Sequence, residues 1–316
     1  MTVWQAISAG LGAAWRNRAV VSLFFTCNLL LAAAVAAPMH SAIADHLGHS
    51  MMANELARGF SASWLTEFQL AYSGFLKGFS ITIVYGGILF LLLNAVLSAG
   101  AFEVLSRAER VEPEDGGSAP GSLRWSMHAF GRGLGRFWGR FLRLTAIASV
   151  SYYVLFWLWA GRVAQFDRWL FRDSVREAPH FYLEWLRWAL LFFCCFMVNA
   201  IGDYARAALV AHPHRSTLAA LGAGTGFVAG RLGRVMAIYL GLGVLAALAV
   251  VAYAAFARFF PQSSAITVFI WFVVAQILLW MRWLLRLSSW AAALAFYQSR
   301  SAQAPASVQD TLPAGA

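Results

Sequence analysis

The chain has 316 residues, of which 60% are hydrophobic and only 12% are charged. Because soluble domains carry about a quarter charged residues, this composition excludes an ordinary soluble protein and predicts a surface that mostly faces lipid. The 24 basic residues outnumber the 14 acidic ones, and nearly all of the basic ones are arginines. We interpret this excess as loops that meet anionic lipid, in preference to nucleic-acid binding.

Apolar runs of about twenty residues, the length that crosses a bilayer, occur six times along the chain. They lie at 19–37, 78–101, 141–161, 185–201, 235–257 and 265–281. The first run also has features of a secretory signal, but it is long enough to span and five more runs follow, so we expect an uncleaved helix. The sequence therefore predicts an all-α polytopic membrane bundle over 1–298, followed by a disordered cytoplasmic tail at 299–316.

The distribution of lysine and arginine sets the orientation of these spans. Most of them fall in the loops that share a side with the N-terminus, which by the positive-inside rule puts both ends in the cytoplasm. The two longer outside segments, 38–77 and 162–183, mix apolar and charged residues at helical intervals. We expect these segments to form short amphipathic helices on the outer leaflet.

Short internal similarities predict that the six spans form three related hairpins. "GRFLRLTAI" at 139–147 and "GRLGRVMAI" at 230–238 each open a span, and "WRNRAVVSLF" at 15–24 is a looser version. An Asn-Ala pair is shared by "LLLNAVLSAGAFEVL" at 91–105 and "CFMVNAIGDYARAAL" at 195–209. Each unit would consist of a basic interfacial segment, an outward helix, an outer segment and an inward helix.

A regular stripe of basic residues precedes the third span. It consists of Arg124, His128, Arg132, Arg136, Arg140 and Arg143, at steps of four or three residues that follow one side of a helix. Another side carries Phe130, Leu134, Phe137, Trp138 and Phe141. One interpretation is an amphipathic helix on the inner leaflet with its arginines on lipid phosphates; the other is ordinary positive-inside topology. The two interpretations are compatible, and both stay open.

The runs "GRFWGRFLRL", "DYARAALV", "RSTLAALGAGTGFVAGRLGRVMAIYL" and "WLLRLSSWAAALAFYQ" resemble a family of uncharacterised bacterial six-span inner-membrane proteins. They are also distantly similar to the membrane domain attached to some glycerophosphodiester phosphodiesterases. The resemblance covers most of the chain from about 80 to 298. It implies a multi-pass protein of the bacterial cytoplasmic membrane, and it carries over no catalytic residue because the phosphodiesterase domain itself has no counterpart in this sequence.

Charged residues within two spans form the main candidate site. Asn199, Asp203 and Arg206 share one face of the fourth span, and Arg282 and Arg286 have a similar spacing on the sixth. Charges at membrane depth are costly, so they pair with one another or line a cavity. We expect Asp203 to neutralise one of the sixth-span arginines, which would leave a positive charge for an anion such as a lipid phosphate. The alternative is that the pair only locks the two helices together.

Two other patterns have the residues of a metal site and of a phosphate-binding loop, but each has a simpler explanation. Histidine and methionine side chains in the first outside segment have the chemistry of a copper site, at Met39, His40, Asp45, His46, His49, Met51 and Met52. Histidines three residues apart are common on exposed helices without metal, so we expect no metal and no cofactor. "GAGTGFVAG" at 222–230 has the glycines of a phosphate loop but follows no strand, and it favours close helix packing instead.

No nucleophile elbow, zinc-protease motif or paired carboxylate is present in the sequence. We therefore expect a non-enzymatic membrane protein that has a structural or accessory role or engages membrane lipids. The alternative is a small transporter for an anionic or amphiphilic solute, which internal repeats and intramembrane charges favour and the lack of broken helices disfavours. An intramembrane enzyme is the third hypothesis. Partners other than membrane lipids are not indicated.

Overall fold

The computed structural model describes residues 1–48, 61–110, 122–163, 165, 177–212, 216–260 and 264–301. Throughout these ranges the secondary structure is helical. Six helices are long and apolar enough to cross a membrane, at Arg18–Gly48, Ser73–Arg107, Leu123–Arg162, Phe181–Ala211, Leu232–Phe259 and Ala265–Arg300. Each predicted apolar run lies inside one of them. The all-α, multi-pass fold is therefore confirmed.

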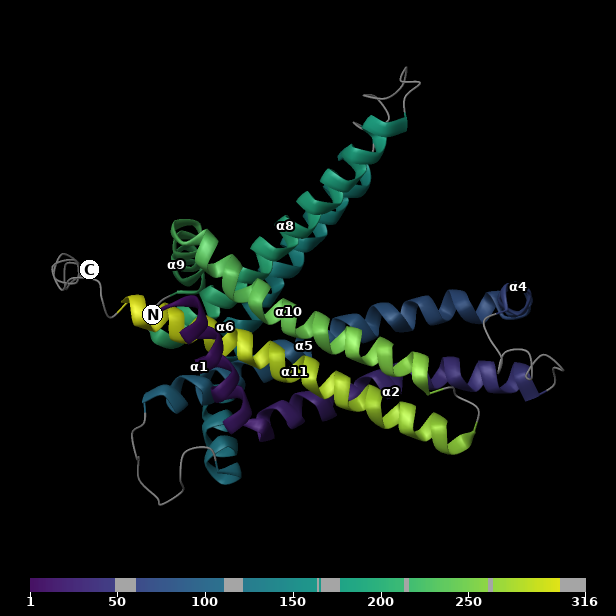
Figure 1. The fold of residues 1–316 in the computed structure, drawn as a ribbon, viewed down its shortest axis with the longest axis horizontal. Helices are drawn as coiled ribbons and strands as arrows, with labels where there is room; N and C mark the ends of the chain where they lie inside the picture. Colours follow the sequence, from purple (N-terminus) through teal and green to yellow (C-terminus); the bar gives the residue numbers. More distant parts are fainter. Residues whose placement is uncertain are drawn as a thin grey trace. The chain divides into compact units, whose positions relative to one another are not determined.

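In chain order the elements are α1 Val3–Arg16, α2 Arg18–Gly48, α4 Ala62–Ala71, α5 Ser73–Arg110, α6 Leu123–Leu158, a π-helical turn η1 Trp159–Val163, α8 Glu177–Ala211, α9 Thr217–Gly230, α10 Leu232–Phe259 and α11 Ala265–Ser301 (Figure 1). Short polar side chains start several of them by accepting a bond from a free backbone N–H group. Thr2 does so for α1, within a capping box completed by Gln5, and Ser216 does so for α9.

The chain forms two compact units, Met1–Val21 with Ala95–Ala316, and Ser22–Asn94. We call them the large and the small unit. Both boundaries lie inside continuous helices, α2 and α5, so no linker separates the units.

In the small unit, α2 pairs with the N-terminal part of α5, up to Asn94. The side-chain amides of Asn28 and Asn94 exchange hydrogen bonds of 3.3 and 2.9 Å. Gly86 gives room to Val35, since a Cβ atom at position 86 would lie 2.7 Å from a Val35 methyl carbon. This pair is the first of the predicted hairpins, and it places the Asn-Ala repeat at a helix contact.

The predicted outer segment 38–77 begins as a continuation of α2, which does not end at Pro38 but runs to Gly48. The short helix α4 then packs through Trp64 and Phe68 on Ala42. Tyr72 follows α4 and its hydroxyl donates to the Asp45 carboxylate at 3.0 Å. That hydrogen bond raises the pKa of the Tyr72 phenol, because it favours the protonated hydroxyl.

The histidine and methionine pattern in this segment does not assemble a metal site from the described residues. The imidazole ring of His46 lies among the rings of Trp64, Phe68 and Tyr72, with centroid distances from 5.5 to 6.1 Å. In the part of the chain that the structure describes, no group of three histidine, cysteine or acidic side chains is placed to hold a metal ion. His49, Met51 and Met52 lie outside the described residues, as does most of the second predicted outer segment, 162–183.

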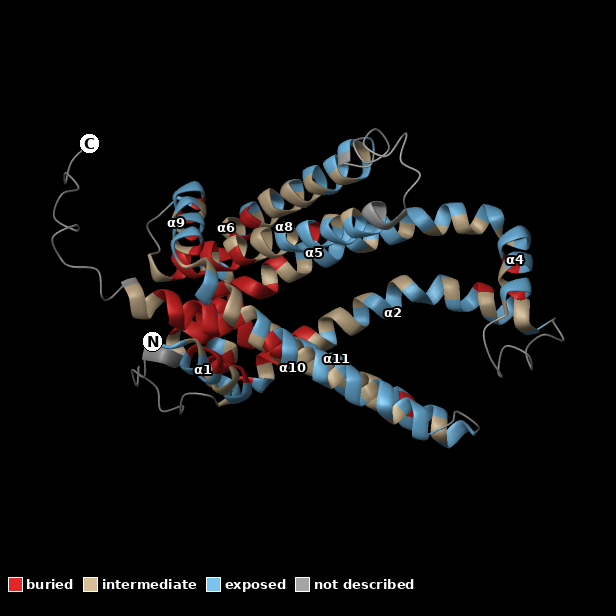
Figure 2. Ribbon diagram, turned by 45° about the horizontal axis from the view of Figure 1, so that its top comes forward, coloured by how far each residue is buried: buried red, intermediate tan, exposed pale blue. Residues whose placement is uncertain are grey.

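The core of the large unit is built from the C-terminal parts of α5, α8 and α11, where buried residues gather (Figure 2). These ends are rich in alanine, glycine and serine, which let helix backbones approach closely. The helix α1 packs on α11 by the same means: a Cβ atom at Gly10 would lie 2.5 Å from the Ser288 carbonyl oxygen. The short helix α9 packs on α8 through Gly224, where a Cβ atom would lie 2.7 Å from the Ala205 nitrogen. Close packing at "GAGTGFVAG" is thus confirmed.

The large unit also contains the second and third hairpins. The helices α6 and α8 form one pair, in which the hydroxyl of Tyr152 on α6 donates to the backbone carbonyl of Cys195 on α8 at 3.2 Å. The helices α10 and α11 form the other pair. The indole of Trp271 on α11 donates to the backbone carbonyl of Phe260, directly after α10, at 3.0 Å, and its ring packs on the ring of Tyr253 on α10. Consecutive long helices therefore pair in the predicted hairpin arrangement.

The repeated basic motifs differ in how they enter their spans. The chain leaves helical geometry at Asn17, between α1 and α2, and at Arg231, between α9 and α10. The motif at 139–147 instead continues through α6 without a break. Gly233 follows the break before α10, whereas the matching position in α6 is Leu142, and glycine weakens a helix where leucine supports it.

Candidate functional site

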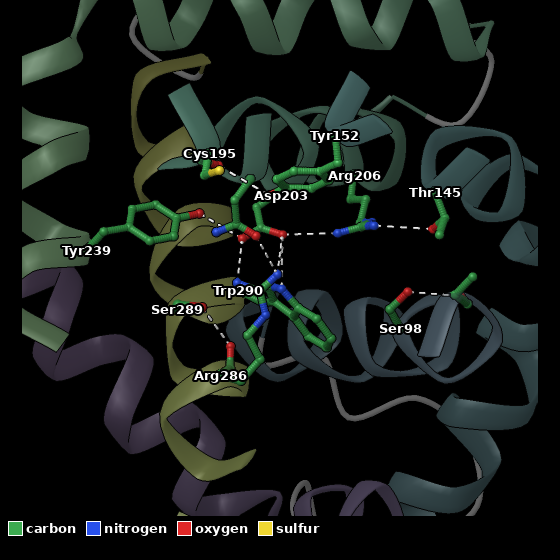
Figure 3. Close-up of polar contacts among 12 residues, drawn as sticks. Ser98, Thr145, Tyr152, Cys195, Asp203, Arg206, Tyr239, Arg286, Ser289 and Trp290 are labelled. Atoms are coloured by element: carbon green, nitrogen blue, oxygen red, sulfur yellow. Dashed lines mark hydrogen bonds and ion pairs between the residues drawn. The ribbon is translucent and has the colours of Figure 1, made fainter. Parts of the chain in front are cut away.

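A network of polar side chains surrounds Asp203 in the core of the large unit (Figure 3). The carboxylate is fully buried. Its Oδ1 accepts from Arg206 Nη1 at 3.0 Å, from Trp290 Nε1 at 3.1 Å and from Arg286 Nη2 at 3.2 Å. Its Oδ2 accepts from the Tyr239 hydroxyl at 2.8 Å and contacts Arg286 Nη1 at 3.1 Å. Four donor side chains thus satisfy one buried carboxylate.

The two arginines each reach a second acceptor on another helix. Arg286 Nη2 donates to Asn199 Oδ1 at 2.9 Å, and Arg206 Nη2 donates to Thr145 Oγ1 at 3.3 Å. The Arg286 guanidinium also lies over the Trp290 ring, 5.1 Å from its centroid, in a cation–π contact. These residues come from α6, α8, α10 and α11, so the network joins the second hairpin to the third.

Two guanidinium groups face one carboxylate, so the network holds one positive charge in excess. The exposed fraction of the side chain is 13% for Arg206 and 31% for Arg286. The excess charge is therefore accessible mainly at Arg286. A positive charge in this position attracts anions.

The bonding pattern favours an electrostatic and structural role over acid–base chemistry. Both Asp203 oxygens already accept hydrogen bonds, and the Tyr239 hydroxyl is engaged as a donor to one of them. The other buried carboxylate in this core, Glu103, is paired with Arg107 at 2.6 Å. Neither carboxylate is placed as a free general base.

Four of the five residues predicted for this site meet in the structure. Asn199, Asp203 and Arg206 converge with Arg286, which confirms that Asp203 has a partner on the sixth span. The fifth, Arg282, is exposed and lies one helical turn before Arg286. One turn shifts a side chain by about 6 Å along the helix, so Arg282 does not reach an acceptor that four donors already occupy.

Sequence reasoning missed Thr145, Tyr239 and Trp290. Trp290 follows Arg286 by four residues and extends the same polar stripe along α11. Thr145 lies within the repeated motif at 139–147, and Tyr239 directly follows the matching motif at 230–238. The two positions are not equivalent in the repeat, because Thr145 aligns with Met236 and Tyr239 with Ala148, so the motifs lie near the network without identifying its members.

The basic stripe on the first half of α6 lies on an accessible side of the helix. The exposed members are Arg124, His128, Arg132, Arg136 and Arg143, while Arg140 is half-buried. Phe130, Phe137 and Phe141 are buried, as the apolar pattern predicts. Trp138 is an exception: 52% of it is exposed, because its position on the helix turns it away from the side that packs on the core.

No protein-family model matches the chain, and neither a curated protein nor a solved structure is significantly similar to it. The resemblance to six-span inner-membrane proteins and to the phosphodiesterase membrane domain therefore stays a prediction.

Proposed function

We propose that this multi-pass protein is a non-enzymatic component of the bacterial cytoplasmic membrane that engages anionic lipids and has both ends in the cytoplasm. The observation that carries the proposal is the network around Asp203. It ties two helix hairpins together and leaves one positive charge in excess, accessible at Arg286. A lipid phosphate is the anion that a membrane supplies to such a charge.

Other surfaces of the large unit support an engagement with lipid. The arginine stripe of α6 is exposed, and so are Trp4 and Trp15 of α1. Tryptophan favours the boundary between headgroups and acyl chains. The Trp15 ring meets the Trp280 ring of α11 with their centroids 6.2 Å apart, so this boundary residue of α1 lies beside the part of α11 that precedes Arg286.

Extraction of the intact protein in polymer-bounded membrane discs, followed by mass analysis of the lipids, tests the proposal. The expected result is an enrichment of anionic phospholipids over the bulk membrane of about twofold or more, since arginines near a surface each contribute about 1 kcal/mol of attraction. Discs of an unrelated six-span protein with few exposed arginines are the control. A lipid composition equal to that of the bulk membrane would overturn the proposal.

A small transporter for an anionic or amphiphilic solute is the second candidate. The three helix pairs and the buried charges favour it, because transporters often combine repeats with charged sites. Transporters often contain broken helices, whereas the described part of each predicted span here is a continuous helix. The π-helical turn that follows α6 is the one irregularity in these described spans. This continuity counts against a transporter. Uptake of labelled anionic solutes into proteoliposomes, absent from liposomes without protein, would decide in favour of transport.

A further inference from the structure

The short helix α1 has three stripes of residues along its length, each at steps of four, three and four residues, so that each follows one side of the helix. The first stripe is buried and consists of Ala6, Gly10, Ala13 and Asn17. The second is exposed or half-buried and holds the large apolar side chains, at Trp4, Ser8, Leu11 and Trp15. The third is also exposed or half-buried and ends on a charge, at Gln5, Ala9, Gly12 and Arg16. We call the second stripe the tryptophan edge and the third the arginine edge.

Contacts of the buried stripe hold both edges outward. Gly10 lies against α11, where its Cβ atom would be 2.9 Å from the Cβ atom of Ala292. At the end of α1, the side-chain amide of Asn17 donates to the Ala13 carbonyl at 2.9 Å, and its oxygen accepts from the hydroxyl of Ser126 on α6 at 3.1 Å. Asn17 and Ser126 are both buried. These contacts to two other helices oppose a rotation of α1 about its own axis.

The short helix α9 packs as α1 does, but without a tryptophan. Both helices have 14 residues, and in both a single residue separates the helix from the candidate span that follows. Gly224 of α9 meets the backbone of α8 as Gly10 of α1 meets that of α11. The sequence of α9 contains neither tryptophan nor arginine. Packing of this kind therefore does not account for Trp4 of α1, 75% of which is exposed.

The place of α1 in the chain and its charge indicate what covers the tryptophan edge. The candidate span α2 begins at Arg18, two residues after the end of α1, so α1 lies where the chain enters the membrane. Residues 1–44 contain no acidic residue, whereas Arg16 and Arg18 are both exposed. This surface is complementary in charge to anionic headgroups. Indole rings, which have an apolar body and a polar N–H group, favour the boundary between headgroups and acyl chains.

We infer that α1 is an interfacial helix on the membrane surface at the side of the N-terminus. Its tryptophan edge lies at the boundary between headgroups and acyl chains, and its arginine edge faces the headgroup phosphates and water. This inference rests on the proposed engagement of lipid and names the element that makes it. Gly12 supports the assignment of the edges: its Cβ atom would lie 3.9 Å from Arg16 Nη1, so the guanidinium group lies along the arginine edge.

Nitroxide labels on the two edges test this inference in the intact protein, reconstituted in discs of phosphatidylglycerol and phosphatidylcholine. The native Cys27, Cys194 and Cys195 are first replaced by alanine, and Ser8→Cys or Ala9→Cys then provides a single site on either edge. Electron paramagnetic resonance compares the collisions of each label with oxygen, which concentrates in lipid, and with a water-soluble nickel chelate. We expect the label at position 8 to favour oxygen and the label at position 9 to favour nickel.

A substitution on the tryptophan edge tests what holds it in the lipid. Trp4→Gln removes the more exposed of its two indole rings and should shift the label at position 8 from oxygen towards nickel collisions. Leu218→Gln is the matched control, because it removes an exposed apolar side chain from the similarly packed helix α9. This control should leave the label unchanged. Equal shifts in the two variants, or none in either, would contradict an anchoring role of Trp4.

The outcomes separate this inference from the proposed function. A label at position 8 that favours nickel would place the tryptophan edge in water, and a label that neither reagent reaches would place it against protein, such as a second copy of the chain. Either result would overturn the inference. Enrichment of anionic lipids together with such a result would leave the proposed function standing. A label in lipid without that enrichment would keep the interfacial helix and remove the proposed function. Equal unfolding midpoints of the labelled variants would exclude misfolding as the cause.

Discussion

Asp203 accepts hydrogen bonds from Arg206 on its own helix and from Tyr239, Arg286 and Trp290 on two others. A buried charge that lost these donors would carry a large desolvation cost, so each donor stabilises the arrangement of the helices. Exchanging the charges of Asp203 and Arg286 is the simplest test of whether the two residues are partners. The structure shows why this exchange would fail even between true partners: an arginine at position 203 would face Arg206 and the indole N–H of Trp290.

Removing one neutral donor gives a milder test at the residue scale. Tyr239→Phe should lower the free energy of unfolding by about 1 kcal/mol, because it deletes the hydroxyl that bonds to Asp203 while the ring stays in place. Tyr153→Phe, at an exposed position on α6, should change it by less than about 0.5 kcal/mol. Unfolding in mixed detergent micelles measures both. Equal effects would show that the bond from Tyr239 contributes nothing.

Glycines within one helix provide a test at the scale of elements. In α9, Gly224→Ala should destabilise the protein by about 1–3 kcal/mol, because its Cβ would press on the backbone of Ala205. Gly226→Ala meets nothing within 4 Å and should stabilise by up to about 1 kcal/mol, since alanine favours helix. Thermal unfolding of the two variants, side by side, measures the difference. Similar shifts in both would mean that α9 does not pack on α8 through Gly224.

At this scale, the sequence predicted the spans and their pairing but not every boundary. Hydropathy over twenty residues is a local property, so the six long helices could be read from it. The apolar run predicts a first span that ends at residue 37, yet α2 continues through Pro38 to Gly48. Likewise, Tyr239 and Trp290 could not be assigned to the site, because periodicity places residues on a helix face but does not say which neighbouring helix that face meets.

At the scale of the whole molecule, the described residues contain six candidate spans, and an even number of crossings would bring both ends to the same side. We expect a fluorescent protein fused to either end to be bright, and alkaline phosphatase fused to either end to be inactive, as is typical of cytoplasmic locations. A phosphatase inserted within the segment 38–77 should be active. An active phosphatase at one end only would mean that one of the six helices does not cross the membrane.

The arrangement of the whole molecule also changes the meaning of its charged residues. In the sequence, Asp203 and the arginines of α11 look like charges deep in a membrane. In the structure, Asp203 and Arg286 lie instead where α8, α10 and α11 converge in the core of the large unit. A network in this position joins the second and third hairpins while part of Arg286 stays exposed.

A double-mutant cycle on Asp203 and Arg286 tests most directly whether this network joins the hairpins. The variants are Asp203→Asn, Arg286→Gln and their combination, and the measurement is the free energy of unfolding in detergent micelles. We predict that each single change costs about 3 kcal/mol, and that the double change costs at least about 1 kcal/mol less than their sum. Losses that add within about 0.5 kcal/mol would contradict a pairing between α8 and α11 at this site.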